Sequence, residues 1–130
     1  MEEILPAVPD GVEVARLIDP ELTRVMSEAV LAWTLYLHRD MPRYARQQRQ
    51  REWTPQVLRR AADRRVGILG LGQLGAAAAT ALAAHGFPVA GWSRSRKRID
   101  AVECFDGGDG LVALLQRSDC LLYTSPSPRD

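Results

Sequence analysis

Lysine is nearly absent from this chain of 130 residues: sixteen of its seventeen basic side chains are arginines, and only Lys97 is a lysine. Cysteine is scarce too, and Cys104 and Cys120 have no companions at the spacing of a metal site. We therefore expect two buried free thiols in a reducing compartment, with no disulfide framework and no metal ligands.

Long apolar runs are also missing. No stretch reaches the roughly 18 apolar residues that a membrane-spanning helix requires. The first residues, MEEILPAVPDG, are acidic and contain prolines, unlike the positively charged start of a secretory signal. These features argue against a membrane span and against a secretory signal.

The chain has no strong excess of either charge, since its formal net charge is +1. Nine arginines do lie between Arg39 and Arg65, a cluster that invites a nucleic-acid interpretation. Acidic residues and glutamines interrupt the cluster, however, and only two aromatic residues, Tyr44 and Trp53, lie within it, too few for a pattern of interleaved aromatics. We expect no nucleic-acid partner, and we interpret the cluster as a helix that is solvated or lies at a dimer edge.

The 46% hydrophobic content is enough to fill a core, and the chain divides into regions of different pattern. Residues 5–20 contain three of the eight prolines, and residues 1–18 are interpreted as a connection that enters the domain. Asp19, Pro20 and Glu21 then form a helix start, with a capping side chain, a proline in the first turn and an acid beside it. Apolar residues follow at helical spacing, and Pro42 kinks or restarts the helix.

From residue 65 onward, short apolar runs alternate with helical segments. Strands are predicted at 65–70, 88–92, 102–105 and 120–122, with helices at 73–85 and 110–119 between them. This order predicts an α/β fold with a partial Rossmann-type, doubly wound parallel sheet, preceded by a long lead-in helix. We place the partial domain at residues 19–122 and expect residues 123–130, which lack apolar periodicity, to be an unstructured tail.

A glycine-rich loop connects the first strand to its helix. Gly70, Gly72 and Gly75 form the pattern G-x-G-x-x-G in the strand-loop-helix context that dinucleotide binding requires. The first glycine permits a tight turn, the second lets the main chain approach a pyrophosphate, and the third allows the helix to pack closely. The N–H groups of Gln73 and Leu74 are expected to face the phosphates at the positive end of the helix.

The second strand predicts which dinucleotide is bound. A site for NAD usually carries an acid about 20 residues beyond the glycine pattern, which accepts a hydrogen bond from the ribose 2′-hydroxyl. Here the strand ends at Trp92, and Ser93, Arg94 and Ser95 follow, with no carboxylate before Asp100. Two hydroxyls and a guanidinium suit a 2′-phosphate, so we expect NADPH as the cofactor.

An arginine–phosphate contact contributes roughly 1.5–3 kcal/mol, which corresponds to about a tenfold to a hundredfold preference for NADP over NAD. Arg96 and Lys97 follow directly, and either add positive field or remain solvated.

The segments VGILGLGQLG and LAAHGFPVAGWSRSRK, taken together, resemble the cofactor domain of the D-isomer-specific 2-hydroxyacid dehydrogenases. The likeness is greatest to the glyoxylate/hydroxypyruvate reductase A group and extends upstream through the lead-in helix, with Met26, Glu28 and Val30 in an M-x-E-x-V segment. It covers about residues 14–122. The resemblance implies a cytoplasmic homodimer that reduces glyoxylate or hydroxypyruvate, a 2-keto acid, with NADPH.

The same resemblance implies that this chain is a fragment. The family's substrate domain is mostly missing, and residues 1–18 would be the linker from it. The family's catalytic arginine, glutamate and histidine would lie downstream of this chain, and neither His38 nor His85 matches that histidine. We therefore expect no catalytic residues here and no activity from the fragment itself. The segment YTSPSPRD departs from the family after about Leu122, which indicates a tail that is not native.

An alternative of another class is a non-catalytic dinucleotide-sensing or regulatory module, related to dehydrogenase-like corepressors. Such a sensor is expected to bind NAD(H), which the loop after Trp92 does not favour. The roles of two tryptophans have alternatives. Trp33 belongs either to the core or to an interface. Trp53 packs in the core or in a loop, or, as the resemblance implies, approaches the active site of a partner subunit.

Overall fold

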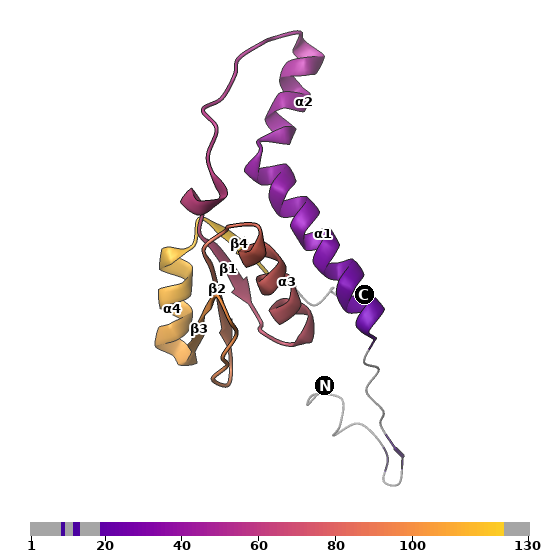
Figure 1. The fold of residues 1–130 in the computed structure, drawn as a ribbon, viewed down its shortest axis with the longest axis vertical. Coiled ribbons are helices and arrows are strands. Elements are labelled where there is room, and N and C mark those ends of the chain that lie inside the picture. The colour runs from indigo at the N-terminus through magenta and orange to yellow at the C-terminus, as the bar shows by residue number, and fades with distance from the viewer. Residues whose placement is uncertain (1–8, 10–11, 14–18, 124–130) are drawn as a thin grey trace.

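The computed structural model describes residue 9, residues 12–13 and residues 19–123. Its centre is a four-stranded parallel sheet in the order β3-β2-β1-β4, made of β1 (Val66–Leu69), β2 (Val89–Ser93), β3 (Val102–Asp106) and β4 (Cys120–Leu122). Helices α3 (Gln73–Ala84) and α4 (Gly107–Arg117) lie on opposite sides of this sheet (Figure 1). The predicted doubly wound α/β fold is therefore confirmed.

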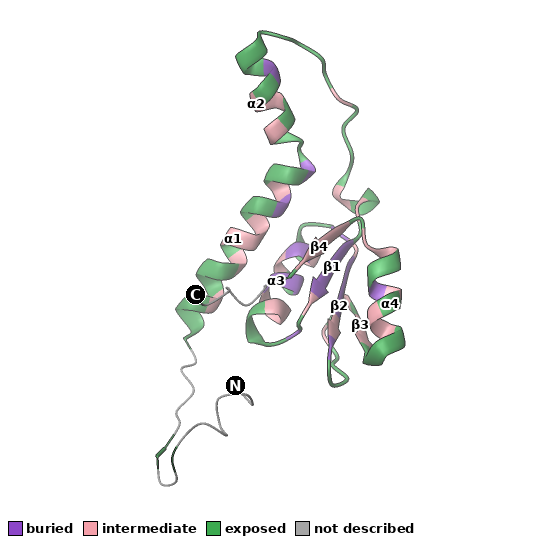
Figure 2. Cartoon of the chain, turned by 180° about the vertical axis from the view of Figure 1, so that it is seen from behind, coloured by how far each residue is buried: buried purple, intermediate pink, exposed green. Residues whose placement is uncertain are grey.

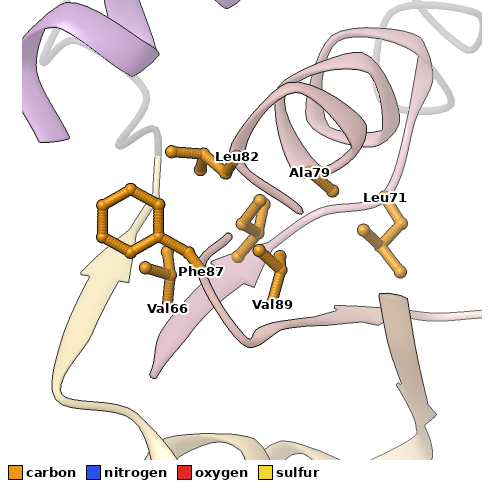
Figure 3. Close-up of a cluster of buried hydrophobic side chains, with 7 residues drawn as sticks. Val66, Leu71, Ala79, Leu82, Phe87 and Val89 are labelled. Carbon is orange, nitrogen blue, oxygen red and sulfur yellow. The ribbon is translucent and has the colours of Figure 1, made fainter. Parts of the chain in front are cut away.

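The core forms where α3 meets the first two strands (Figure 3). Leu82 of α3 and Val66 of β1 are completely buried, and Phe87 closes the turn between α3 and β2. The small side chains of α3 allow this helix to lie close to the sheet, so that one row of alanines and a leucine supplies its buried face. This packing fixes the positions of β1 and β2 relative to α3.

Two helices precede the sheet and extend beyond it (Figure 1). In α1 (Pro20–His38), Asp19 caps the first turn by accepting a hydrogen bond of 2.9 Å from the Glu21 N–H. The chain turns at Asp40, whose φ of 53° ends the first helix, and α2 (Met41–Gln50) begins with Pro42 in its first turn. The predicted restart at Pro42 is confirmed.

The long lead-in helix α1 is only lightly covered. Val30, Leu31 and Leu35 pack against the core, whereas most of the remaining helix is exposed (Figure 2). Trp33 is 64% exposed and therefore does not belong to the core. The sequence did not show which face of α1 is buried, because apolar residues lie on more than one side of the helix.

The arginine cluster is not one continuous helix, contrary to expectation. Helix α2 ends at Gln50, Arg51 adopts a left-handed conformation with φ 56°, and residues 52–60 run back to the sheet without regular structure. Trp53 in this connection is 83% exposed, so it is not a core residue. Cys104 and Cys120 are free thiols and are half-buried rather than buried.

Several predictions concern segments outside the described residues. The proposed linker falls almost wholly on positions that are not described, and so does the tail after Tyr123. Within the described part of the chain, no helix is both long enough and apolar enough to cross a membrane.

Candidate cofactor-binding site

The glycine loop leaves the sheet in a turn that only glycine adopts easily. Gly70 follows β1 with a φ of 104°, a left-handed conformation that disfavours any residue with a Cβ. Its N–H donates a 2.9 Å hydrogen bond to the carbonyl oxygen of Trp92, which ties the loop to the end of β2. This hydrogen bond joins the glycine turn to β2 at the carboxyl edge of the sheet.

Helix α3 starts directly after this turn. Gly72 is its N-cap, so Gln73 and Leu74 are the first helical residues, as predicted. Their N–H groups belong to the first turn, where a helix has no internal acceptors and carries a partial positive charge. The first turn of α3 can therefore donate hydrogen bonds to an anionic group.

Gly72 and Gly75 differ in what surrounds them. A Cβ on Gly75 would overlap the carbonyl oxygen of Gly70, so this glycine lets the helix approach its own loop. A Cβ on Gly72 would meet no atom within 4 Å, so the space beside this residue is open. An open space at an N-cap glycine is what a ligand that approaches the main chain requires.

A cavity of about 380 Å³ lies over the loop, and its lining includes all five predicted residues from Gly70 to Gly75. The opposite wall comes from α1, through Met26 and Val30, which the sequence analysis did not assign to the site. Their spacing of four residues on one helix face was visible in the sequence. The fact that this face covers the glycine loop was not, because α1 and α3 pack at a long sequence separation.

The second part of the predicted site lies at the end of β2. Ser93 is the last residue of the strand, in register with Asp106 of β3, and Arg94 and Ser95 follow on the surface. Trp92 anchors this edge, since its indole N–H donates a 2.7 Å hydrogen bond to the carbonyl oxygen of Gly107. Because β1 and β2 are adjacent and parallel, the glycine loop and these residues lie at the same edge of the sheet.

Ser93 is placed differently from the two residues after it. Its side chain is buried, and its hydroxyl donates a 2.7 Å hydrogen bond to the carbonyl oxygen of Ser95. This bond closes a short turn whose exposed residues are Arg94 and Ser95. The hydroxyl proton is thus already engaged within the turn.

The two histidines are remote from the glycine loop. His38 ends α1 and is buried edge-to-face against Phe87, with ring centroids 5.1 Å apart. Burial, followed by the positive charge of Arg64, lowers the pKa of His38. His85 is the C-cap of α3, and its Nδ1 lies 2.8 Å from the carbonyl oxygen of Ala81. Among residues 19–123, no three histidines, cysteines or acids gather as a metal site would require.

Comparison with known proteins agrees with this geometry. Residues 31–130 match the family model for the D-isomer specific 2-hydroxyacid dehydrogenase, NAD binding domain. A glyoxylate/hydroxypyruvate reductase A from Yersinia enterocolitica is 39% identical over 119 residues, which are 92% of this chain and 38% of that protein. The chain thus spans well under half the length of the curated relatives it matches.

Two solved structures show the same arrangement. A D-isomer specific 2-hydroxyacid dehydrogenase from Xanthobacter autotrophicus, in complex with NADPH and MES, is 44% identical with a TM-score of 0.86, over 95% of this chain and 52% of that one. An NADPH-dependent glyoxylate/hydroxypyruvate reductase from Sinorhizobium meliloti, in complex with NADP and sulfate, is 43% identical with a TM-score of 0.85, over 95% of this chain and 39% of that one. On its fold, its glycine loop and these matches, the chain belongs to the D-isomer specific 2-hydroxyacid dehydrogenase family, and its residues 31–130 match that family's NAD-binding domain.

Proposed function

We propose that this chain binds NADPH as the cofactor-binding part of an oxidoreductase that reduces a 2-keto acid, glyoxylate or hydroxypyruvate, to the 2-hydroxy acid. The observation that carries the proposal is the shared sheet edge. There the open N-terminus of α3 at Gly72 lies beside a turn that presents Arg94 and carries no carboxylate.

The pyrophosphate is proposed to bind at the first turn of α3. The open space at Gly72 admits it, and the N–H groups of Gln73 and Leu74 donate to its oxygens. The ribose 2′-phosphate is proposed to bind Arg94 and Ser95, with Ser93 holding the turn from beneath. When bound, the nicotinamide supplies a hydride, while the residues of this chain orient the cofactor and exclude water from its apolar side.

The substrate class rests on relatives rather than on a substrate pocket in this chain. The curated relatives are named as glyoxylate/hydroxypyruvate reductases, and a solved relative is named as NADPH-dependent. We propose that residues 1–130 alone bind the cofactor but do not turn over substrate, because neither His38 nor His85 lies at the glycine loop. Glyoxylate-dependent oxidation of NADPH by this chain would contradict the proposal that the chain does not turn over substrate.

Cofactor choice can be tested directly by titrating NADPH and NADH into the chain and following nucleotide fluorescence. Arg94→Ala should weaken NADPH binding by about tenfold to a hundredfold, with little effect on NADH. Arg43→Ala, on the exposed face of α2, is the matched control because it removes the same charge away from the site. Tight NADH binding that Arg94→Ala does not alter would instead favour the dinucleotide-sensing module.

We also propose that two copies of the complete protein pair through α1, in the cytoplasm. The support is the set of large apolar side chains that this helix leaves exposed: Leu22, Val25, Trp33, Tyr36 and Leu37. Trp33 and Tyr36 stack edge-to-face with ring centroids 5.6 Å apart, so they form a preorganised apolar patch. Such a patch on a helix is typical of a protein–protein interface.

A further inference from the structure

Gly91 lies in the middle of β2, where nothing in the backbone requires a glycine. It pairs in regular parallel register with Ile68 of β1 and with Cys104 of β3, and its φ lies outside the left-handed region. A glycine inside a strand weakens that strand and often marks a place where another group approaches closely. Gly91 therefore indicates a close approach from another part of the chain.

The side chain of Leu71 makes this approach. A Cβ on Gly91 would overlap the end of the leucine side chain and would lie 2.7 Å from its Cγ. Leu71 is 3% exposed and belongs to the cluster of buried side chains between α3 and the sheet (Figure 3). The packed core leaves the leucine little room to move aside, so an added methyl group at residue 91 would displace the main chain of residue 71.

Leu71 is also the inward-facing part of the glycine loop. Among residues 70–75, Leu71 alone is buried, and the three residues after it are exposed. The N–H of Gly70 donates a 2.9 Å hydrogen bond to the carbonyl oxygen of Trp92. The loop is thus attached to two consecutive residues of β2, through a hydrogen bond at Trp92 and an apolar contact at Gly91.

We propose that Leu71 and Gly91 are positioning residues for the dinucleotide. The leucine side chain packs on Gly91 and thereby holds the N–H groups of the first turn of α3 where the pyrophosphate binds them. The inference rests on the proposed binding of NADPH at this loop. A loop that packing already holds in place loses less conformational entropy when its ligand binds. Because NADPH and NADH share the pyrophosphate, the contact should affect both nucleotides alike, in contrast to Arg94.

Gly67 of β1 provides a matched control. A Cβ on Gly67 would overlap the hydroxyl group of Ser118, the C-cap of α4, and would lie 3.2 Å from the side chain of Leu121. Gly67→Ala therefore strains the sheet as Gly91→Ala does, but on the face that α4 covers and not at the glycine loop. Both variants should lower the free energy of unfolding, and only Gly91→Ala should weaken nucleotide binding.

The test is a fluorescence titration of the 130-residue chain and its variants with NADPH and with NADH, beside urea unfolding of the same samples. We expect Gly91→Ala to weaken the binding of both nucleotides by about tenfold, because a displaced loop loses a hydrogen bond to a charged phosphate. Gly67→Ala should leave both affinities unchanged, although it unfolds at a lower urea concentration.

A double variant tests the contact itself. Leu71→Ala removes the atoms that a methyl group at residue 91 would overlap. Combined with Gly91→Ala, it should therefore bind both nucleotides several times more tightly than Gly91→Ala alone. The loss of a buried leucine keeps the stability of the double variant below that of the unmodified chain, so affinity recovers while stability does not.

A second measurement needs no nucleotide. The hydrogen bond from Gly70 to Trp92 should slow the hydrogen exchange of the Gly70 N–H in the unmodified chain and in Gly67→Ala. In Gly91→Ala this exchange should be faster relative to the N–H groups of β1. If Gly91→Ala does not fold, Leu71→Ala alone decides, because it releases the loop without adding an atom and should weaken the binding of both nucleotides severalfold.

The outcomes separate this inference from the proposed function. If the unmodified chain does not bind NADPH, the proposed function is wrong, and the exchange of the Gly70 N–H still tests the contact. Three results would overturn the positioning role alone: Gly91→Ala binds NADPH as tightly as Gly67→Ala, it loses affinity for NADPH but not for NADH, or the double variant binds no better than Gly91→Ala.

Discussion

Gly72 and Gly75 belong to one motif but serve different purposes. The space beside Gly72 is open, so this residue matters to a ligand more than to the fold. Gly75 faces the carbonyl oxygen of its own loop, so this residue matters to the fold first. Substitution of each by alanine separates binding from stability.

For Gly72→Ala we expect a folded protein that binds NADPH poorly. The added methyl group meets no protein atom, and the N-cap φ of −71° suits alanine, so the free energy of unfolding should fall by no more than about 1 kcal/mol. The same methyl group lies where the pyrophosphate approaches the main chain, so NADPH affinity should fall at least tenfold. Urea unfolding and fluorescence titration measure the two effects, and undiminished NADPH affinity would contradict the proposed site.

For Gly75→Ala we expect a loss of stability as well. The new Cβ overlaps the carbonyl oxygen of Gly70, so the loop or the helix must shift, at a cost of about 1–3 kcal/mol. Urea unfolding should show a lower midpoint than for Gly72→Ala. Equal midpoints would show that the helix accommodates the methyl group.

Ser93 tests whether the turn after β2 must keep its shape for the chain to prefer NADPH over NADH. Ser93→Ala removes the 2.7 Å hydrogen bond to Ser95, which contributes about 1 kcal/mol. We expect a severalfold weaker affinity for NADPH with almost no change for NADH, because only NADPH has the 2′-phosphate. Ser93→Thr keeps the hydroxyl and should restore the affinity for NADPH. If Ser93→Ala weakens the binding of NADPH and NADH equally, Ser93 acts only on stability.

At the scale of elements, one ion pair joins the starts of β1 and β4. Asp119 accepts hydrogen bonds from the main-chain N–H of Arg65 at 2.8 Å and from its guanidinium at 3.1 Å. The hydrogen bonds from the Arg65 side chain hold the pKa of Asp119 well below its ordinary value. This clamp fixes the edge strand β4, which has only three residues.

The clamp should make stability depend on pH. A carboxyl group whose pKa is lower in the folded chain stabilises it above the unfolded pKa of about 3.9, and this stabilisation is lost as the pH falls below that value. Asp119→Asn should therefore lower the unfolding midpoint in urea at pH 7, and the difference from the unmodified chain should shrink as the pH falls from 5 to 3. Asp100→Asn serves as the control for loss of one negative charge, and a constant difference across that range would contradict the role of the carboxylate.

At the scale of the whole molecule, α1 and α2 extend beyond the sheet with little covering (Figure 2). The exposed apolar patch of α1 and the exposed Trp53 are the features of this chain that a second copy would bury. The proposed pairing therefore depends on a helix whose inner face covers the glycine loop through Met26 and Val30. Association and cofactor binding would share one element.

We expect the chain to associate in a concentration-dependent manner through α1. Trp33→Glu places a charge in the middle of the patch and should shift the sedimentation-equilibrium mass toward that of a monomer. The change lies on the exposed side of the helix, so the far-ultraviolet circular dichroism should be retained. Gln50→Glu, at an exposed position of α2, adds the same single negative charge and serves as the control. An unchanged mass for Trp33→Glu would show that the patch is not the interface.

The amino-acid sequence by itself determined the alternation of strands and helices, the glycine loop and the position of Arg94 after β2. Those features depend on local rules: a positive φ that needs glycine, a period of two or of 3.6, and a strand that ends where polar residues begin. The tertiary structure alone decided that Ser93 turns inward, that Met26 and Val30 cover the loop, and that His38 is buried against Phe87. The physical reason is that such contacts join side chains from separate elements, and no local periodicity records which faces meet when the helices pack.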